Sequence, residues 1–354
     1  MADYYDWQKT FSYDADVTMV VGARGVGKTF GIRTQFIRDF IKDGSRFVEL
    51  TRYKNELFGV SNGYFKRVGD QKEFNDYVFK TNTSNAYIAR KDSKDEKGKY
   101  NWLTIGYFVA LSDAQRMKKR TFDHVRRILL DEAIIDKFDR YHTYLPNEYG
   151  ILANIVDTVS RERADTDGIR PRVYLLGNAV DFANPYFSAY KVNSRMEFGY
   201  KWYADKTFLL HYVESREYSQ EKASGTVAGR MMMRTGEAST AINNEFQMES
   251  KEFVERKPGR AKFMFGIYLN GNRFGVWVDY EEGLYYVNAK VPRGEENKVY
   301  TLTRSDSTVN MMAARRADKV MKGFCELWYL GLVRYETLDV KMRFNEVLDI
   351  FGIR

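Results

Sequence analysis

Two kinds of apolar pattern alternate along the first half of the chain. Short runs rich in β-branched and aromatic residues predict buried strands, and apolar residues at helical spacing between them predict amphipathic helices. The predicted strands cover residues 17–21, 46–51, 106–112, 124–130 and 172–178. Strands and helices in alternation favour a parallel sheet flanked by helices. We therefore expect an α/β domain over residues 1–198.

The pattern changes after residue 198. Residues 199–250 are polar, with a run of methionines and of small residues, and predict a lid or linker. From residue 261, alternating apolar runs are joined by Asn-Gly and Glu-Gly, which are typical turns of antiparallel hairpins. Two helical stretches follow, at about 308–330 and 337–350. This order predicts a second, smaller α+β domain over residues 251–354.

A glycine-rich motif directly follows the first predicted strand and precedes a helical stretch that ends at Asp43-Gly44. It reads G-x-x-x-x-G-K-T and consists of Gly22, Ala23, Arg24, Gly25, Val26, Gly27, Lys28 and Thr29. In such a P-loop, backbone N–H groups surround a phosphate, the lysine binds the outer phosphates and the hydroxyl holds Mg²⁺. A chance glycine turn is the alternative, but strand and helix flank the motif in the order that phosphate binding requires. The motif predicts a nucleotide site.

An acidic pair, Asp131-Glu132, follows the apolar strand at 124–130. In P-loop ATPases this pair is the Walker B element, in which the first acid orders the Mg²⁺ shell and the second polarises the attacking water. Acidic pairs at strand ends are common, but this one comes after a P-loop and has its apolar run on the correct side. We therefore expect ATP as the nucleotide, Thr29 and Asp131 as Mg²⁺ ligands, and Glu132 as the catalytic base.

Two further positions have both a structural and a functional interpretation. Asn178 ends a predicted strand, at the edge where parallel sheets bind ligands. It either senses the γ-phosphate or forms a turn. Arg161 closes a predicted helix that begins near Pro146. It either complements the helix dipole or acts as an arginine finger on the γ-phosphate of a neighbouring subunit.

The chain has a formal net charge of +8 over 354 residues, which permits a polyanionic partner without demonstrating one. One charged run contains Lys91, Lys94, Lys97 and Lys99 and is either a solvated loop or a DNA-contacting loop. Further DNA-binding candidates near the acidic strand are Lys119, Arg120 and Lys137. No apolar stretch is long enough to span a membrane. The single cysteine, Cys325, cannot form an internal disulfide, which suits a reducing cytoplasm.

Several motifs together resemble a known family, the genome-packaging ATPases of small tailed phages with protein-primed linear DNA, of the phi twenty-nine type. Besides the P-loop and the acidic pair, these motifs are Arg52-Tyr-Lys54, Leu145-Pro-Asn-Glu148, Asp157-Thr-Val159, Gly177-Asn-Ala179, Asn184-Pro-Tyr-Phe187 and Phe274-Gly-Val-Trp-Val-Asp279. They extend from the first domain into the second, so the resemblance covers most of the chain. Leu-Pro-Asn-Glu and Gly-Val-Trp-Val-Asp have no general reason to recur, which makes the resemblance specific.

The resemblance implies an ATP-driven motor of the wider terminase/FtsK-HerA-like ASCE class, which translocates double-stranded DNA into a preformed procapsid. It implies a homopentameric ring whose partners are the procapsid portal and a packaging RNA. The implied location is the host cytoplasm and, transiently, the portal vertex. The resemblance keeps the roles of the P-loop and of the acidic pair. It also places Arg161 at the position of a trans-acting arginine and makes Lys118 a second trans-acting cation.

The second domain resembles the RNase H-like nuclease domain of terminase-type motors, but it lacks the acidic cluster. In those motors acids occupy the first strand and later strand ends. Here residues 263–269 contain no carboxylate, and Asp279 stands alone on the second strand. Two-metal cleavage requires a cluster of carboxylates. We therefore expect a degenerate domain that binds DNA, RNA or the portal, and no nuclease activity.

Two other functions fit the same ATPase core. One is a DNA helicase or repair ATPase, which would separate strands, whereas a packaging motor moves intact duplex. The other is a nucleotide-gated nucleic-acid-binding module without a motor role. Intact Lys28, Thr29, Asp131 and Glu132 disfavour the second alternative, because a pure switch does not require a water-activating acid.

Overall fold

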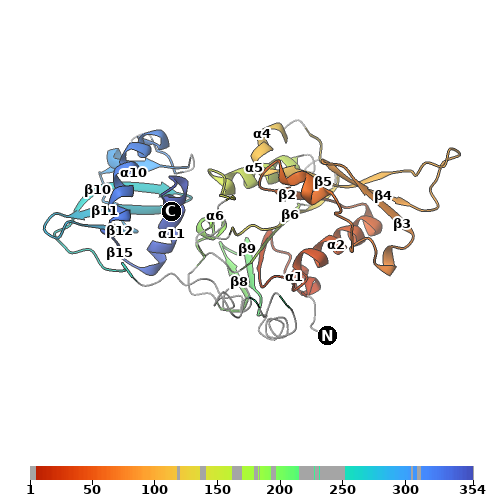
Figure 1. Cartoon of the computed structure of the whole chain (residues 1–354), viewed down its shortest axis with the longest axis horizontal. Helices are drawn as coiled ribbons and strands as arrows, with labels where there is room; N and C mark the ends of the chain where they lie inside the picture. Colours follow the sequence, from red (N-terminus) through yellow and green to blue (C-terminus); the bar gives the residue numbers. More distant parts are fainter. Residues whose placement is uncertain are drawn as a thin grey trace. The chain divides into compact units, whose positions relative to one another are not determined.

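The computed structural model describes residues 5–117, 120–135, 141–161, 170–178, 182, 184–192, 197–214, 227, 231, 252–303, 306–308 and 312–353. These residues form two compact units, each built around its own sheet (Figure 1). Besides residues 252–353, the second unit contains two shorter described segments, 141–149 and 184–192.

A nine-stranded mixed sheet forms the first unit, in the order β3-β4-β5-β2-β6-β7-β1-β9-β8. The six strands from β5 to β9 in this order are parallel, and β3, β4 and β8 are antiparallel additions at the edges. The strand bounds are β1 Val17–Val21, β2 Arg46–Thr51, β3 Tyr77–Thr81, β4 Asn85–Arg90, β5 Leu103–Ala110, β6 Val125–Leu130, β7 Arg172–Gly177, β8 Gly199–Tyr203 and β9 Phe208–Tyr212. The predicted parallel sheet is confirmed for the centre and extended on both sides.

The helix after the P-loop packs on the middle of this sheet. Ile32, Phe36 and Ile37 are buried at helical spacing, and Phe36 stacks on Phe47 of β2 with ring centroids 4.6 Å apart. This packing fixes the helix that carries the P-loop lysine. The helical segments are α1 Trp7–Ser12, α2 Lys28–Asp43, α3 Glu56–Ser61, α4 Ala114–Met117 and α5 Glu148–Arg161, with short 3-10 turns at Lys72–Phe74 (η1) and Leu111–Asp113 (η2).

The strand order gathers the predicted site at one edge of the sheet. β7 lies between the P-loop strand β1 and the acidic strand β6, and all three are parallel. Their carboxyl ends therefore meet at the same edge, which is where parallel sheets bind ligands. This edge carries the P-loop after β1, Asn178 after β7 and Asp131 after β6. The observed strand order fits the P-loop α/β domain expected from the sequence.

Residues 199–212 were predicted to belong to a lid or linker, and for them this prediction is wrong. They form the hairpin β8–β9, and β9 pairs parallel with the P-loop strand β1. The turn of this hairpin contains three non-glycine residues with positive φ, namely Ala204, Asp205 and Lys206. It therefore lacks the Asn-Gly or Asp-Gly signal by which a hairpin is recognised in a sequence. Most of the remaining predicted lid lies outside the described residues.

A six-stranded sheet forms the second unit, in the order β14-β13-β10-β11-β12-β15. The strands β10, β11 and β12 form antiparallel hairpins, whereas β13 pairs parallel with β10, and β15 with β12. Asn270 and Gly271 make the first turn with positive φ, as their sequence predicts. The elements are α6 Pro185–Ala189, β10 Lys262–Leu269, β11 Asn272–Asp279, β12 Leu284–Asn288, η3 Glu296–Lys298, β13 Val299–Thr301, β14 Met312–Ala313, α10 Ala314–Tyr329, β15 Val333–Tyr335 and α11 Leu338–Ile350.

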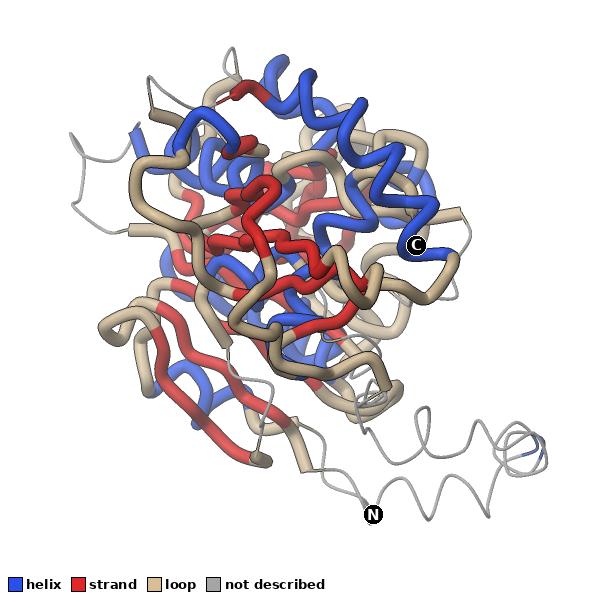
Figure 2. Tube along the Cα trace, turned by 90° about the vertical axis from the view of Figure 1, so that its left-hand side faces the viewer, coloured by secondary structure: helices blue, strands red, loops and turns tan. Residues whose placement is uncertain are grey.

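The core of the second unit lies between its sheet and the helices α10 and α11. Figure 2 shows the helix at the C-terminus in blue, with red strands beside it. Phe265 of β10 meets Phe324 of α10 at 6.1 Å, and Phe274 of β11 meets Phe344 of α11 at 5.2 Å between ring centroids. This is the smaller α+β domain expected from the sequence. β15 was not predicted, because a run of three residues is too short to give a periodic pattern.

Two of the sequence motifs meet in the second unit. Glu148 is buried, and its carboxylate accepts hydrogen bonds from the Leu145 backbone N–H (2.9 Å) and from the Tyr186 hydroxyl (2.7 Å). Both segments belong to the same compact unit as the C-terminal residues, to which Asn272 Nδ2 of β11 links them by donating to Ser188 Oγ at 2.7 Å. The predicted boundary, which assigned everything before residue 199 to the ATPase domain, is wrong for these segments, since their buried polar contacts could not be read from local sequence.

Candidate nucleotide-binding and hydrolysis site

The loop between β1 and α2 has the conformation that its glycines allow. Gly25 and Gly27 have φ angles of 92° and 85°, in the left-handed region that favours glycine, and α2 begins at Lys28. The Lys28 ammonium donates hydrogen bonds to the carbonyl oxygens of Gly22 (2.7 Å) and Ala23 (2.9 Å). Loop, lysine and helix N-terminus together form an anion-binding site.

The N-terminal arm of the chain supports this loop. Trp7 Nε1 donates to the backbone oxygen of Lys28 at 2.9 Å, and the Tyr5 N–H donates to the backbone oxygen of Val26 at 3.0 Å. A Cβ atom added to Gly31 would lie 2.4 Å from the Trp7 ring, so the ring packs closely on α2 only because this residue is glycine. These contacts of the arm with the P-loop were not predicted from the sequence. The aromatic composition of the arm was the one feature of the sequence that pointed to them.

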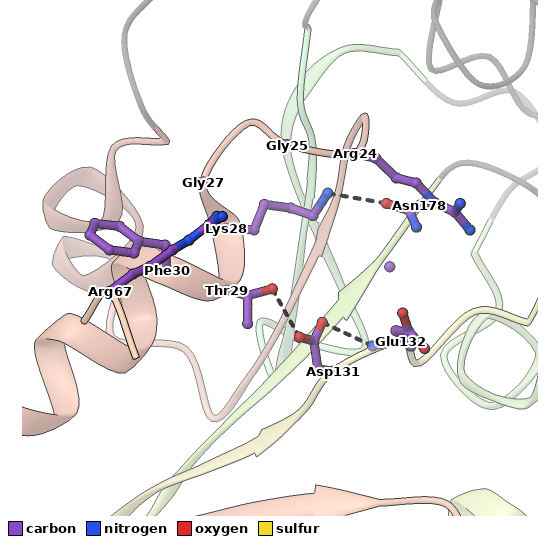
Figure 3. Close-up of a pocket in the computed structure, with 11 residues that line it drawn as sticks. Arg24, Gly25, Gly27, Lys28, Thr29, Phe30, Arg67, Asp131, Glu132 and Asn178 are labelled. Atoms are coloured by element: carbon purple, nitrogen blue, oxygen red, sulfur yellow. Dashed lines mark hydrogen bonds between the residues drawn. The ribbon is translucent and has the colours of Figure 1, made fainter. Parts of the chain in front are cut away.

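The hydroxyl and the carboxylate predicted to hold Mg²⁺ lie next to each other. Thr29 Oγ1 donates to Asp131 Oδ2 at 2.9 Å, and the Glu132 backbone N–H donates to Asp131 Oδ1 at 3.0 Å (Figure 3). Mg²⁺ prefers oxygen ligands and usually binds one or two protein groups together with phosphates and water. One hydroxyl and one carboxylate in contact meet that requirement.

Glu132, the predicted catalytic base, follows directly. Its side chain is exposed and lines the same cavity as Lys28 and Thr29, and its backbone has a positive φ of 52°. Arg52, buried just after β2, donates to the backbone oxygens of Glu132 (3.4 Å) and Ala133 (3.2 Å). These bonds hold the stretch of backbone that carries the base. Arg52 belongs to a motif of the resemblance, but its contact could not be deduced from spacing.

Asn178 lies against the P-loop. With its amide nitrogen towards the Gly22 carbonyl oxygen, 3.2 Å away, its amide oxygen accepts from Arg24 Nε at 3.3 Å. In the opposite orientation its oxygen lies 3.4 Å from Lys28 Nζ. Both orientations place the amide beside the groups that would bind the outer phosphates. This position is the one that the phosphate-sensing interpretation requires, and the role itself stays a prediction.

These groups surround one cavity of about 470 Å³. Its lining consists of Arg24, Gly25, Gly27, Lys28, Thr29, Phe30, Arg67, Asp131, Glu132, Gly177 and Asn178. Gly22, Ala23 and Val26, which were also predicted, form part of the loop without lining the cavity. Phe30 and Arg67 were missed as site residues, because no motif of the sequence assigns them a role.

A buried ion pair contributes to the electrostatic surroundings of the site. Arg33 of α2 pairs with Glu49 of β2, and the guanidinium lies over the Tyr64 ring, 4.6 Å from its centroid. Burial raises the pKa of Glu49, and Arg33 opposes this rise. Burial alone would lower the pKa of Arg33, but the Glu49 carboxylate raises it. Because the charge of Asp131 contributes to both shifts, the pair lies within its electrostatic reach.

Of the two predicted trans-acting cations, the structure describes only Arg161, and it does not bring Arg161 to this cavity. Arg161 ends α5, is exposed, and pairs with Asp157 one turn earlier. It does not line the cavity of its own chain. This place is compatible both with a helix-end cation and with a finger offered to another subunit, so the role stays a prediction. Lys118 lies outside the described residues.

Four DNA-binding candidates are exposed on one loop between β4 and β5: Lys91, Lys94, Lys97 and Lys99. Asp95 closes this loop by accepting hydrogen bonds from the backbone N–H groups of Lys97 (2.9 Å) and Lys99 (2.7 Å). Their side chains are thereby left at the surface, where contact with DNA is geometrically possible.

Arg120 differs from these lysines because it is partly buried. It donates to Asn85 Oδ1 at 3.0 Å and lies over the ring of Tyr107, 5.7 Å from its centroid. Burial lowers the pKa of Arg120. These contacts indicate a packing role and do not favour the predicted DNA contact. Lys119 and Lys137 lie outside the described residues.

Within the described part of the chain, no helix has the length and apolarity needed to cross a membrane. In the same residues, no group of three or more His, Cys, Asp or Glu side chains is placed to hold a metal ion. The Mg²⁺ site considered above is of a different kind, because it combines one carboxylate and one hydroxyl with the phosphates of a nucleotide.

Comparisons with known proteins agree with this geometry. A family model described as Podovirus DNA encapsidation protein (Gp16) matches residues 1–349. The chain is 35% identical over 309 residues to the DNA packaging protein of Bacillus phage phi29, covering 87% of this chain and 85% of that protein. It is 31% identical over 331 residues to the DNA packaging protein of Bacillus phage B103, covering 92% and 94%. Among solved structures it resembles a chain of the bacteriophage Phi-29 viral genome packaging motor assembly, with 30% identity, a TM-score of 0.63 and 99% of both chains covered. The chain therefore belongs to the Podovirus DNA encapsidation protein (Gp16) family and is an ATPase that acts in the packaging of viral DNA.

Proposed function

We propose that the chain hydrolyses ATP with Mg²⁺ as a subunit of a homo-oligomeric ring, and that the ring translocates double-stranded DNA into a preformed procapsid. The observation that carries this proposal is the single cavity lined by Lys28, Thr29, Asp131 and Glu132. These side chains supply a phosphate-binding cation, two Mg²⁺ ligands and a candidate general base. A module that only switches on nucleotide binding does not require the last of these.

Each side chain has a defined task in this mechanism. Lys28 binds the outer phosphates, and Thr29 and Asp131 would hold Mg²⁺, which neutralises charge on the phosphate oxygens when bound. Glu132 accepts a proton from the water that attacks the γ-phosphate. The bonds of Asp131 to the Thr29 hydroxyl and to a backbone N–H support this task, because they orient its carboxylate within the cavity.

Catalysis is completed between subunits in this proposal. Arg161 lies outside the cavity of its own chain and is held at the helix surface by Asp157. In the ring, Arg161 exchanges this partner for the γ-phosphate bound by a neighbour, where an arginine finger stabilises transition-state charge. Lys118 is the second candidate for this contact, and a pentamer is the ring that the family resemblance implies.

The loop between β4 and β5 is the DNA-contacting element that we favour. Two aromatic rings of this segment lie beside cations: Lys80 of the neighbouring strand β3 is 4.2 Å from the ring centroid of Trp102, and Lys94 of the loop is 4.9 Å from that of Tyr100. Cations neutralise the backbone phosphates of duplex DNA, which gives binding that does not depend on sequence. The portal and a packaging RNA are the further partners, which we assign to the second unit.

Packaging in a defined mixture tests this function. The mixture contains the protein, procapsids with portal and packaging RNA, linear duplex DNA and ATP, and the measurement is DNA protected from nuclease digestion. Wild-type protein should protect DNA only when ATP is present. Lys28→Ala should protect none, because it lacks the phosphate-binding cation, whereas Lys66→Ala, an exposed lysine outside the cavity, should act like wild type. Strand separation on a tailed duplex without protection would indicate a helicase and contradict the proposal.

A further inference from the structure

One end of the nucleotide cavity takes no part in the reaction described above. Phe30 and Arg67 line this end. In Figure 3 they lie on the opposite side of Lys28 from Asp131 and Glu132. The half-buried Phe30 ring and the exposed Arg67 side chain therefore line the same open cavity as the phosphate-binding groups.

The catalytic groups determine how a nucleotide lies in this cavity. The γ-phosphate must lie near Glu132, because water attacks it there, and the N-terminus of α2 holds the phosphate chain. Phe30 directly follows the Mg²⁺ ligand Thr29 on α2. The part of the nucleotide that remains, the ribose and the base, then extends towards Phe30 and Arg67. This end of the cavity is the place for adenosine.

The loop that carries Arg67 is held by its neighbours on both sides. Tyr64, Phe65 and Val68 are buried in the core of the first unit. Arg67 has a φ of 70°, which is uncommon for a residue other than glycine, and its N–H donates to the Asp70 carboxylate at 3.3 Å. Strained backbone of this kind persists where the surroundings determine it, and it concentrates at functional sites.

The same loop is also bonded to the P-loop helix. Gln71 Nε2 donates to Thr34 Oγ1 of α2 at 2.9 Å. It also donates to the backbone oxygen of Val68, in the same loop as Arg67, at 2.9 Å. These bonds join the loop of Arg67 to the helix that carries Phe30. The two residues are therefore presented as a pair whose relative position is set before a ligand binds.

We propose that Arg67 and Phe30 bind the adenosine part of ATP, with the Arg67 guanidinium stacked on the base and the Phe30 ring providing apolar surface beside it. A planar guanidinium stacks on aromatic systems, whereas the ammonium of lysine does not offer a flat surface. This inference rests on the proposed ATPase function and adds to it the residues that recognise the base side of the nucleotide.

A matched pair of ligands tests this assignment. Mg²⁺–ADP and Mg²⁺–pyrophosphate share their phosphates and differ by the adenosine, and their dissociation constants are measured by calorimetry on the full chain. Arg67→Ala should weaken ADP binding about tenfold, the effect of losing one desolvated stacking contact, while pyrophosphate binding stays as in wild type. Arg67→Lys should behave like Arg67→Ala, because it keeps the charge and loses the plane. In turnover, the loss should appear in KM for ATP.

The controls separate this inference from the function on which it rests. Lys66→Ala, next to Arg67 and outside the cavity, should bind both ligands like wild type. If Arg67→Ala weakens pyrophosphate as much as ADP, or if Arg67→Lys restores ADP binding, Arg67 contacts phosphate and the inference is wrong. Unchanged ADP binding in Arg67→Ala would also overturn it. A wild-type protein that binds neither ligand would instead overturn the proposed ATPase site, and this inference with it.

Discussion

Each of the two sheets has a functional-looking aspartate at the end of a strand, and the two aspartates have different partners. Asp131, after β6, accepts hydrogen bonds from the Thr29 hydroxyl and from a backbone N–H. Asp279, the last residue of β11, accepts from the guanidinium of Arg260 at 2.8–3.0 Å. Neutral donors leave the charge of Asp131 available to a metal ion, whereas Arg260 already neutralises Asp279. An acidic residue at the end of a strand therefore indicates a metal site only where its carboxylate is not already paired with a cationic side chain.

The surroundings of Asp279 also differ from those of Asp131. Its side chain is 1% exposed, and the hydrogen bond from Arg260 holds its pKa below the usual range. Arg260 also faces Glu281 at 3.3 Å and Glu282 at 3.4 Å. Three acids thus share one guanidinium, whereas two-metal cleavage requires a cluster of carboxylates free to bind metal ions. This arrangement supports the view that the second unit is a binding domain, and the absence of nuclease activity stays a prediction.

Removing the base at the β6 site should cause a large loss of ATP hydrolysis. Glu132→Gln keeps the size and the backbone of Glu132 and removes its ability to accept a proton. ATP hydrolysis should fall by a factor of about a hundred or more, the usual contribution of a general base, while ATP binding is retained. Steady-state turnover and equilibrium nucleotide binding measure the two parts. The matched control is Glu281→Gln at the β11 end, which should hydrolyse ATP at the wild-type rate.

Mixtures of variants sharpen this first prediction. Arg161→Ala should bind ATP and hydrolyse it slowly, since arginine fingers contribute roughly 10³- to 10⁵-fold in other nucleotidases. In a ring that pairs Glu132→Gln subunits with Arg161→Ala subunits, some interfaces hold an intact glutamate and an intact arginine. Such mixtures should hydrolyse ATP faster than either variant alone, at concentrations where rings assemble. Only the average of the two rates would show that Arg161 acts within its own subunit or merely ends its helix.

The site was predictable from the sequence where one local motif carries the chemistry. The P-loop and the acidic pair each combine a strand with its polar end, and parallel strand order then brings Thr29 and Asp131 together. Trp7, Arg52 and Arg67 were not predictable as site residues. Each reaches the site through contacts distant in sequence, such as the hydrogen bond from Trp7 to the backbone of Lys28, and no spacing rule describes them.

The fold was predictable where turns carry a recognisable signal. The Asn-Gly turn at 270–271 marks the hairpin β10–β11, and the alternation around it indicates which residues are buried. The hairpin β8–β9 turns through residues 204–206 without glycine or asparagine, so its strands were assigned to a lid. The short segments at 141–149 and 184–192 were misplaced for another reason. They join the second unit through contacts distant in sequence, such as the hydrogen bond from Asn272 to Ser188 and that between Tyr186 and Glu148.

The next largest expected effect is on stability and comes from a third carboxylate, that of Glu346. Among the described residues it forms no ion pair that would offset the cost of burying its charge. Glu346 of α11 is buried, and its Oε2 atom has no hydrogen-bond partner within the described residues. Burial raises the pKa of Glu346 from 4.5 to about 7. The folded state therefore binds this proton more tightly than the unfolded state does. The contribution of this bound proton to the free energy of unfolding is therefore complete below pH 4.5, and it is lost as the pH rises through 7.

Glu346→Gln should remove this loss, because glutamine does not ionise. The free energy of unfolding of the second unit should rise by up to about 3 kcal/mol at pH 8 and change little near pH 4.5. Hydrogen exchange of the α11 amides in the full chain, corrected for intrinsic rates, measures the change at both pH values. Glu326→Gln, on the exposed face of α10, is the control and should show no such pH dependence. An equal effect of Glu346→Gln at both pH values would show that Glu346 is not protonated in the folded state.

The last prediction is that the second unit does not cleave DNA, so the variants tested here should cause no change at all. The full chain should leave linear and supercoiled DNA intact with Mg²⁺ or Mn²⁺, because Asp279 is neutralised and β10 contributes no carboxylate. Arg260→Ala separates these two reasons. It frees Asp279 from its cation but adds no second acid to β10, so DNA should still remain intact. Cleavage that begins in Arg260→Ala and disappears in Arg260→Ala/Asp279→Asn would show that one guanidinium is all that keeps this sheet from nuclease chemistry. Cleavage by the wild type that Asp279→Asn abolishes would show that the ion pair does not block metal binding at all.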